Sequence, residues 1–166
     1  MSQSTPTEQT VLVVDDDPAV LGVVSKMLAQ EGFHVLQASG SSDALRLCKN
    51  HQGRIDLLVT DLVLPPPDFS FASEANEYPH VHGHDLAIRA LHMRTDLRVV
   101  LISGNLDKDL AGYGIRRGVL PFIEKPLQSP AFLNLVKQVL QGPPPSVESL
   151  TETQKPVVTE HNEWVD

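Results

Sequence analysis

The sequence of 166 residues predicts one α/β domain built around a parallel sheet of five strands. Short apolar runs recur five times along the chain, and each is too brief to form a helix. The runs are apolar at nearly every position, which is typical of strands buried on both faces of a sheet. An amphipathic stretch with helical spacing follows each run. Strands that alternate with helices in this way define a (βα)5 arrangement.

The first strand is predicted at residues 11–14, an unbroken run of valine and leucine. Asp17 followed by Pro18 is typical of a helix N-cap and first helical position, so Asp17 is interpreted as a cap rather than a metal ligand. Apolar residues at positions 20, 24 and 28 lie on one face of this helix. Gly32 is expected to end it.

The remaining elements follow the same rule. The second strand is expected at residues 33–38, and Ser41 or Ser42 should cap a helix in which Cys48 is a packing residue rather than a redox thiol. Later strands are expected at residues 55–60, 99–102 and 120–123. Helices are expected around residues 86–91, weakly at 106–117 because of two glycines, and at 130–141.

Composition limits the domain and its surroundings. Residues 1–9 are interpreted as a disordered leader, residues 10–141 as the globular domain, and residues 142–166 as a disordered, acidic, proline-rich tail. The formal charge of −8 argues against direct nucleic-acid binding. A single cysteine excludes an internal disulfide, and no secretory signal or membrane span is evident. A cytoplasmic protein is therefore expected.

Polar side chains gather where the predicted strands end. Asp15–Asp17 follow the first strand, Asp61 ends the third, Ser103 follows the fourth and Lys125 follows the fifth. Because sites in open α/β sheets form beyond the carboxyl ends of the strands, these groups should share one rim. Two carboxylates about 4 Å apart repel by on the order of 4 kcal/mol at an effective dielectric constant near 20, so this rim calls for a cation. Mg²⁺ suits such oxygen ligands.

Four segments carry a resemblance to a known family: VLVVDDDP, DLLVTDLVLP, VVLISG and FIEKP, in this order and with the expected elements between them. Together they resemble a response-regulator receiver domain of two-component signalling, of the single-domain type, across residues 10–141. The resemblance implies a flavodoxin-like receiver fold with the strand order 2-1-3-4-5. A flavin carrier of related fold is rejected, because three aspartates stand where a phosphate-binding loop would be needed.

The resemblance also implies roles for individual residues. Asp61 matches the phosphoacceptor, and Asp15 and Asp16 match the acidic pair that binds Mg²⁺, with Asp16 the more direct ligand. Asp61 itself and the backbone carbonyl of Val63 match the remaining protein ligands. Lys125 matches the ion-pair partner of the phosphoryl group. The chemistry is consistent, because an ionised aspartate can attack phosphorus while cations neutralise the phosphoryl oxygens.

Two further residues match the family's switch. Ser103 matches the hydroxyl residue that contacts the phosphoryl group, and Phe122 matches the rotating aromatic residue. The peptide bond between Lys125 and Pro126 matches one that the family holds in the cis form. Val63 places an apolar side chain where some relatives have an amide or acid, which predicts a long-lived phosphoryl group.

The function that the resemblance implies is transfer of a phosphoryl group to Asp61 from a phosphohistidine of a partner kinase or phosphotransfer protein. Such a protein is a signalling phosphoacceptor rather than an enzyme, and it catalyses at most its own phosphorylation and dephosphorylation. Output is expected through a downstream protein partner, at a face formed by the fourth helix, fifth strand and fifth helix, which could also form a homodimer. Two alternatives remain: a non-phosphorylated interaction module with the same fold, and a receiver excised from a hybrid histidine kinase.

The main departure from the family is an insertion over residues 66–82, PPDFSFASEANEYPHVH, where loops of about 2–6 residues are usual. It follows the strand that ends at Asp61, so it could gate the phosphodonor or contact a partner. His80, His82 and His84 alternate near its end. A polar loop in solvent is a better interpretation of them than a metal site, because no firm carboxylate or cysteine accompanies them.

Overall fold

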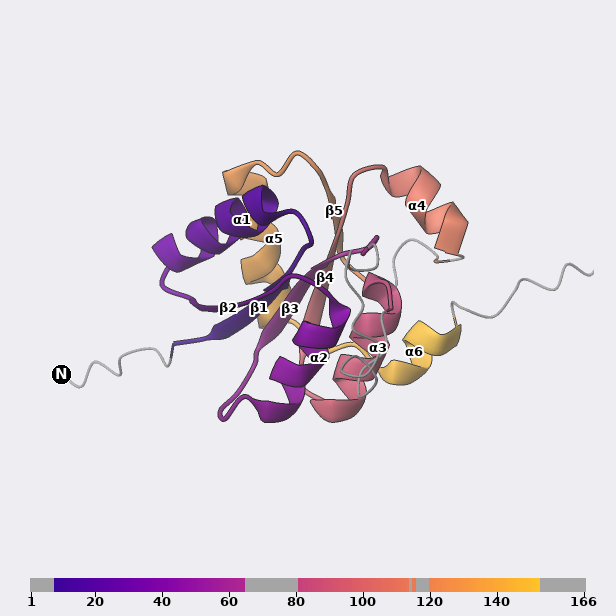
Figure 1. Cartoon of the computed structure of the whole chain (residues 1–166), viewed down its shortest axis with the longest axis horizontal. Helices are drawn as coiled ribbons and strands as arrows, with labels where there is room; N and C mark the ends of the chain where they lie inside the picture. The colour runs from indigo at the N-terminus through magenta and orange to yellow at the C-terminus, as the bar shows by residue number, and fades with distance from the viewer. Residues whose placement is uncertain (1–7, 65–80, 114, 116–119, 153–166) are drawn as a thin grey trace, which may run out of the picture.

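The computed structural model describes residues 8–64, 81–113, 115 and 120–152. Most of the predicted leader, most of the 66–82 insertion with His80, and the tail beyond residue 152 lie outside the described residues. Five parallel strands form one sheet in the order β2-β1-β3-β4-β5, with helices on both faces (Figure 1). The fold class and strand order predicted from the sequence are confirmed.

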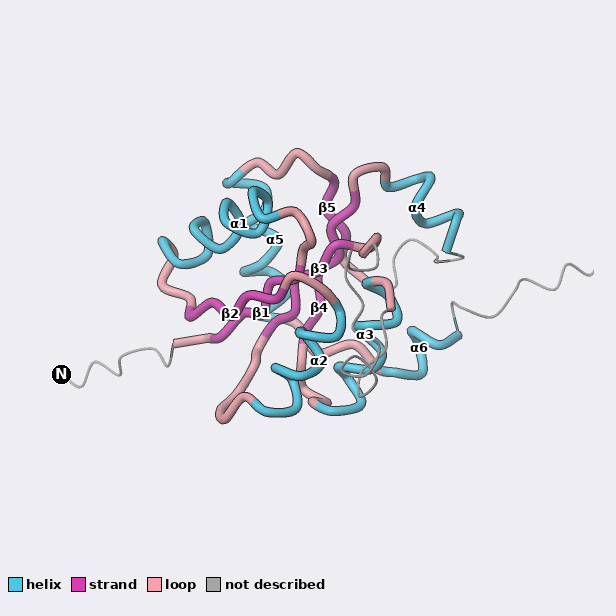
Figure 2. Tube along the Cα trace, viewed as in Figure 1, coloured by secondary structure: helices cyan, strands magenta, loops and turns pink. Residues whose placement is uncertain are grey.

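The elements follow the expected alternation, with one additional helix at the end (Figure 2). The strands are β1 Thr10–Val14, β2 His34–Ala38, β3 Leu57–Asp61, β4 Arg98–Ser103 and β5 Phe122–Glu124. The helices are α1 Pro18–Gln30, α2 Ser41–Asn50, α3 Gly83–Met93, α4 Leu106–Tyr113, α5 Ser129–Gln141 and α6 Val147–Glu152. The predicted weak helix over 106–117 thus ends at Tyr113, and residues 114 and 116–119 lie outside the described residues.

The two faces of the sheet bury separate apolar clusters. All five residues of β1 are buried, and alternate side chains point to opposite faces. Leu12 packs with α2 and α3 on one face, and Val13 packs with α1 and α5 on the other. This two-sided burial explains why β1 and β3 contain no alternation of apolar and polar residues. Cys48 lies in the first cluster, where burial raises the pKa of its thiol to about 11, as expected of a packing residue.

One predicted helix cap is correct and another is wrong. The Asp17 carboxylate accepts a hydrogen bond from the backbone N–H of Ala19 at 2.9 Å, so it caps α1 as expected. In α2 the N-cap residue is Gly40, not Ser41 or Ser42. Ser41 is buried inside the first turn, and its hydroxyl accepts a hydrogen bond from the N–H of Val81 at 2.9 Å. The Ser41 hydroxyl, which was predicted to cap α2, therefore binds the backbone of Val81, a residue distant in the sequence.

The prediction that structure ends at Gln141 is wrong for residues 142–152. The Arg98 guanidinium donates to the Gly142 carbonyl at 2.9 and 3.1 Å, which fixes the chain as it leaves α5. Helix α6 then packs beside α3, with Leu150 fully buried and Val147 partly buried in the same cluster (Figure 1). This helix is too short for its apolar residues to form a recognisable periodic pattern in the sequence. Its packing against α3 stabilises it.

Candidate functional site

Three carboxylates lie together at the carboxyl edge of the sheet. β1 and β3 are neighbours with Val14 opposite Thr60, so the residues that follow in register, Asp15 and Asp61, are brought side by side. One oxygen each of Asp15, Asp16 and Asp61 lies within 4.8 Å of the others. Asp15 and Asp61 are buried, whereas Asp16 is exposed. The parallel register therefore assembles an acidic cluster from separate strand ends.

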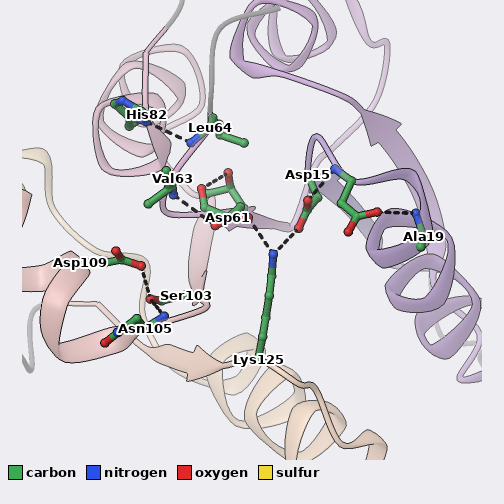
Figure 3. A network of polar contacts seen from close by, with 12 residues as sticks. Asp15, Ala19, Asp61, Val63, Leu64, His82, Ser103, Asn105, Asp109 and Lys125 are labelled. Atoms are coloured by element: carbon green, nitrogen blue, oxygen red, sulfur yellow. Dashed lines mark hydrogen bonds and ion pairs between the residues drawn. The ribbon is translucent and has the colours of Figure 1, made fainter.

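Lys125 joins two of these carboxylates. Its ammonium nitrogen lies 2.8 Å from Asp61 Oδ2 and 3.2 Å from Asp15 Oδ2 (Figure 3). Burial of the ammonium group lowers its pKa, but the hydrogen bond that it donates to Asp61 and the charges of both carboxylates outweigh this, so the pKa of Lys125 is raised overall. The side chain stays cationic at neutral pH. The bond between Lys125 and Pro126 is cis, as the resemblance implied.

The Asp15 carboxylate is only partly satisfied. Its Oδ1 accepts a hydrogen bond from the N–H of Asp17 at 2.9 Å, but its fully buried Oδ2 has no hydrogen-bond partner, although Lys125 lies in ion-pair range. Burial raises the pKa of Asp15, and the charge of Asp61 adds to this, while Asp17 and Lys125 oppose it. An orphaned buried oxygen beside two further carboxylates is an arrangement that fits a hard divalent cation.

The end of β3 is held by the start of α3. Asp61 Oδ1 accepts a hydrogen bond from the N–H of Val63 at 3.1 Å, and Leu62 accepts one from the N–H of Gly83 at 2.9 Å. A Cβ atom at Gly83 would clash with the Asp61 carbonyl oxygen and lie 2.9 Å from the Cα of Leu62. Only glycine allows this approach, so Gly83 positions the loop that presents Asp61.

Ser103 makes hydrogen bonds toward α4 rather than toward Asp61. Its hydroxyl donates to Asp109 Oδ2 at 2.6 Å and accepts from the N–H of Asn105 at 3.1 Å (Figure 3). Ser103 is fully buried. Sequence reasoning did not identify Asp109, because nothing in the spacing of residues 103 and 109 marks them as a pair. Phe122, in β5, is half-buried against the cluster that contains α2 and α3.

The two described histidines of the alternating set occupy different environments. His82 is the N-cap residue of α3, and its Nδ1 accepts a hydrogen bond from the N–H of Leu64 at 3.0 Å. His84 is buried within α3, and burial lowers its pKa although Asp85 opposes the shift. Among the described residues, the group with metal-ligand spacing is the Asp15, Asp16 and Asp61 cluster. His84 is thus part of the fold rather than of a polar loop in solvent.

Comparison with known proteins agrees with this geometry. The family model described as the response regulator receiver domain matches residues 11–68, and the match ends inside the 66–82 insertion. The transcriptional regulator NtrC of Azospirillum brasilense is 29% identical over 82% of this chain and 25% of its own length. The two-component response regulator ARR2 of Arabidopsis thaliana is 25% identical over 82% of this chain and 18% of its own length. The chain thus spans a quarter or less of these relatives.

Solved structures give the same result. A response regulator receiver protein of Sinorhizobium medicae has a TM-score of 0.64 at 25% identity, covering 81% of this chain and 96% of that one. The receiver domain of the hybrid histidine kinase CckA has a TM-score of 0.60 at 26% identity, covering 80% and 99%. These matches support the interpretation of the folded part of this chain as a response-regulator receiver domain. None of the described helices has the length and apolar character to cross a membrane.

Proposed function

We propose that Asp61 accepts a phosphoryl group from a phosphohistidine of a partner histidine kinase or phosphotransfer protein, in a Mg²⁺-dependent reaction. The observation that carries this proposal is the pairing of Asp61 with Lys125 at 2.8 Å, beside the partly satisfied Asp15. An ionised, oriented carboxylate next to a fixed ammonium group can act as a nucleophile toward phosphorus.

The transfer exchanges one bond to phosphorus for another. A carboxylate oxygen of Asp61 forms a P–O bond while the P–N bond of the phosphohistidine breaks, and the departing imidazole keeps the bonding electron pair. Charge spreads over the phosphoryl oxygens, and little covalent work is left to the protein beyond positioning and electrostatic stabilisation. Lys125 supplies a positive charge, and Val63 orients the carboxylate through its N–H.

The divalent cation would be held by the acidic cluster. Asp15, Asp16 and Asp61 provide carboxylate oxygens, and the backbone carbonyl of Val63 is the fourth proposed ligand. When bound, Mg²⁺ supplies positive charge that offsets the charge of the phosphoryl oxygens. The buried Oδ2 of Asp15, which lacks a hydrogen-bond donor, supports this assignment.

Phosphorylation would then switch a protein-binding face. We infer that Ser103 turns toward the phosphoryl group and that Phe122 moves into the space it leaves, which alters the face formed by α4, β5 and α5. Shifting a population from 1:99 to 99:1 needs roughly 5.5 kcal/mol. A few hydrogen bonds to charged groups, at about 1.5–3 kcal/mol each, are of this size.

Domain limits and partners belong to the same proposal. The receiver domain would begin at residue 10 and include helix α6, Val147–Glu152. The 66–82 insertion would gate the phosphodonor or contact a partner. Output would pass to a downstream protein in the cytoplasm, or through a homodimer at the α4, β5 and α5 face. The formal charge of −8 disfavours a direct role in nucleic-acid binding.

The test is intact-protein mass after incubation with acetyl phosphate and Mg²⁺. We expect wild type to gain one phosphoryl group, Asp61→Asn to gain none, and excess EDTA to prevent the gain in wild type. Asp43→Asn, which removes an exposed carboxylate in the first turn of α2 and outside the acidic cluster, is the matched control and should behave as wild type. A gain that persists in Asp61→Asn would place the phosphoryl group elsewhere.

A donor protein gives the second arm. Wild type that gains no phosphoryl group from acetyl phosphate or from a phosphorylated histidine phosphotransfer protein would overturn the proposal and favour a non-phosphorylated interaction module. The persistence of the phosphoryl group after donor removal tests the side chain at position 63. We expect slow loss in wild type and faster loss in Val63→Asn, because an amide can orient the attacking water.

A further inference from the structure

The hydroxyl of Ser103 has a single proton, and that proton is committed to Asp109. The donor–acceptor distance of 2.6 Å to Asp109 Oδ2 is short for a hydroxyl, as expected when the acceptor is an ionised carboxylate. One lone pair of the same oxygen is occupied by the N–H of Asn105. A serine hydroxyl can donate only one hydrogen bond, so it cannot serve Asp109 and a second anion at once.

Asp109 lies in the first turn of α4, and a second contact ties that turn to the sheet. The N–H of Leu106 donates to Glu124 Oε2, at the end of β5, at 3.1 Å. The Ser103–Asp109 bond therefore joins the end of β4 to α4, while Glu124 joins β5 to the same turn. Asp109 is only half-buried, so its carboxylate can be hydrated once Ser103 leaves it.

From this geometry we propose that Asp109 is a positioning residue that holds the Ser103 hydroxyl toward α4 and opposes its contact with a phosphoryl group on Asp61. The inference rests on the proposed function of Asp61. A phosphoryl group on Asp61 competes with the Asp109 carboxylate for the Ser103 hydroxyl donor. The acceptor that binds this hydroxyl determines the positions of Ser103 and of the first turn of α4. Asp109 thus sets the threshold of the switch.

The inference predicts that removal of Asp109 favours the liganded state. The probe is beryllofluoride, a phosphoryl mimic, whose affinity for the protein with Mg²⁺ is measured by isothermal titration calorimetry. We expect Asp109→Ala to bind beryllofluoride about tenfold more tightly than wild type, because no bond to Asp109 must first be broken. Asp109→Asn, which keeps a neutral acceptor, should fall between the two and also guards against misfolding.

Asp107→Ala is the matched control, since it removes an exposed carboxylate from the same turn with the same change in charge. Its affinity should stay within about twofold of wild type, because hydrogen bonding rather than net charge governs the effect. In the Ser103→Ala background the Asp109→Ala substitution should have no effect, since Asp109 acts through the serine. A purely structural role for Asp109 would not depend on Ser103.

A spectroscopic readout tests positioning without ligand. The backbone amide of Asn105 donates to Ser103 Oγ, so its NMR shift reports the serine. In unliganded Asp109→Ala we expect this signal to move along the line that joins the free and beryllofluoride-bound positions of wild type. Equal or weaker affinity in Asp109→Ala while wild type binds would overturn the role of Asp109. Absence of binding and of phosphorylation in wild type would instead overturn the proposed function of Asp61.

Discussion

Gly83 lies directly against the backbone of Asp61, so that the first residue of α3 and the last residue of β3 are in contact. The position leaves no room for a side chain, since a Cβ there would meet backbone atoms of Asp61 and Leu62 rather than a flexible group. The N–H of Gly83 also donates to the Leu62 carbonyl at 2.9 Å. The loop after Asp61 is therefore shaped by Gly83, a residue outside the acidic cluster.

We expect Gly83→Ala to destabilise the fold and to impair phosphorylation of Asp61, because the backbone that presents the carboxylate must move. Overpacking of this kind costs about 1–3 kcal/mol. Gly22→Ala is the matched control: nothing lies within 4 Å of its Cβ position in α1, and alanine there should stabilise by about 0.5–1 kcal/mol. Urea unfolding and intact mass after acetyl phosphate treatment measure both effects. Unchanged phosphorylation in Gly83→Ala would contradict a positioning role.

Asp15 should reduce stability in exchange for cation binding. Burial raises the pKa of Asp15 above its ordinary value of 3.8. A carboxyl whose pKa is higher in the folded than in the unfolded state destabilises the fold. This penalty is absent well below pH 3.8 and is complete above the folded-state pKa. Asp15→Asn keeps the oxygen that accepts from Asp17, so with EDTA at pH 7 we expect its unfolding free energy to rise above that of wild type.

The comparison for Asp15 is Asp16→Asn, which removes an exposed member of the same cluster. Both substitutions should weaken Mg²⁺ binding in a calorimetric titration, but only Asp15→Asn should change unfolding by urea in EDTA. Adding Mg²⁺ should stabilise wild type by mass action and leave Asp15→Asn nearly unaffected. Lower stability of Asp15→Asn in EDTA would show that the buried charge is compensated.

His84 should make the fold sensitive to mild acid. Burial lowers its pKa from 6.5, so the folded state binds its proton less readily than the unfolded state. Stability from this group is therefore complete above pH 6.5 and is lost as pH falls below it, by at most about 1.4 kcal/mol per pH unit. We expect the drop in unfolding free energy between pH 7.5 and 5.5 to be smaller in His84→Gln than in wild type. Equal drops would refute this role.

Helix α6 should contribute to the stability of the hydrophobic core. Leu150 is fully buried against the cluster that contains α3, so Leu150→Ala should lower the unfolding free energy by about 2–5 kcal/mol. Glu148→Ala, at an exposed position of α6, should have an effect within about 0.5 kcal/mol. Urea unfolding distinguishes them. Equal small effects would mean that α6 is not docked in solution.

Sequence reasoning was most successful where the signal is local or repeated. Continuous apolar runs such as residues 11–14 predicted strands buried on both faces, and the Asp17 cap depends only on residues two positions apart. The grouping of Asp15 with Asp61 could be predicted because parallel strands end at one edge.

Features that depend on tertiary contacts could not be predicted in this way. Ser41 is a strong cap residue by type, but its hydroxyl serves the N–H of Val81, forty positions away. Leu150 belongs to an apolar pattern too short to distinguish from a tail, and its burial depends on α3. The Ser103–Asp109 bond requires the turn after β4 to bring α4 back over the strand end. Each of these features depends on a tertiary contact that no periodic sequence pattern indicates.

The contacts at the two ends of the inserted segment also bear on how much sequence this chain can accommodate there. The Leu64 N–H bonds to His82, and the Val81 N–H bonds to Ser41, so the chain is clamped where it leaves the sheet and where it returns. Each doubling of the length of a flexible loop adds only about 0.6 kcal/mol of closure entropy. With both ends fixed in this way, residues can be added, exchanged or removed between positions 64 and 81 while the position of Asp61 stays the same. Partner specificity could therefore change in this segment without a change in the chemistry at Asp61.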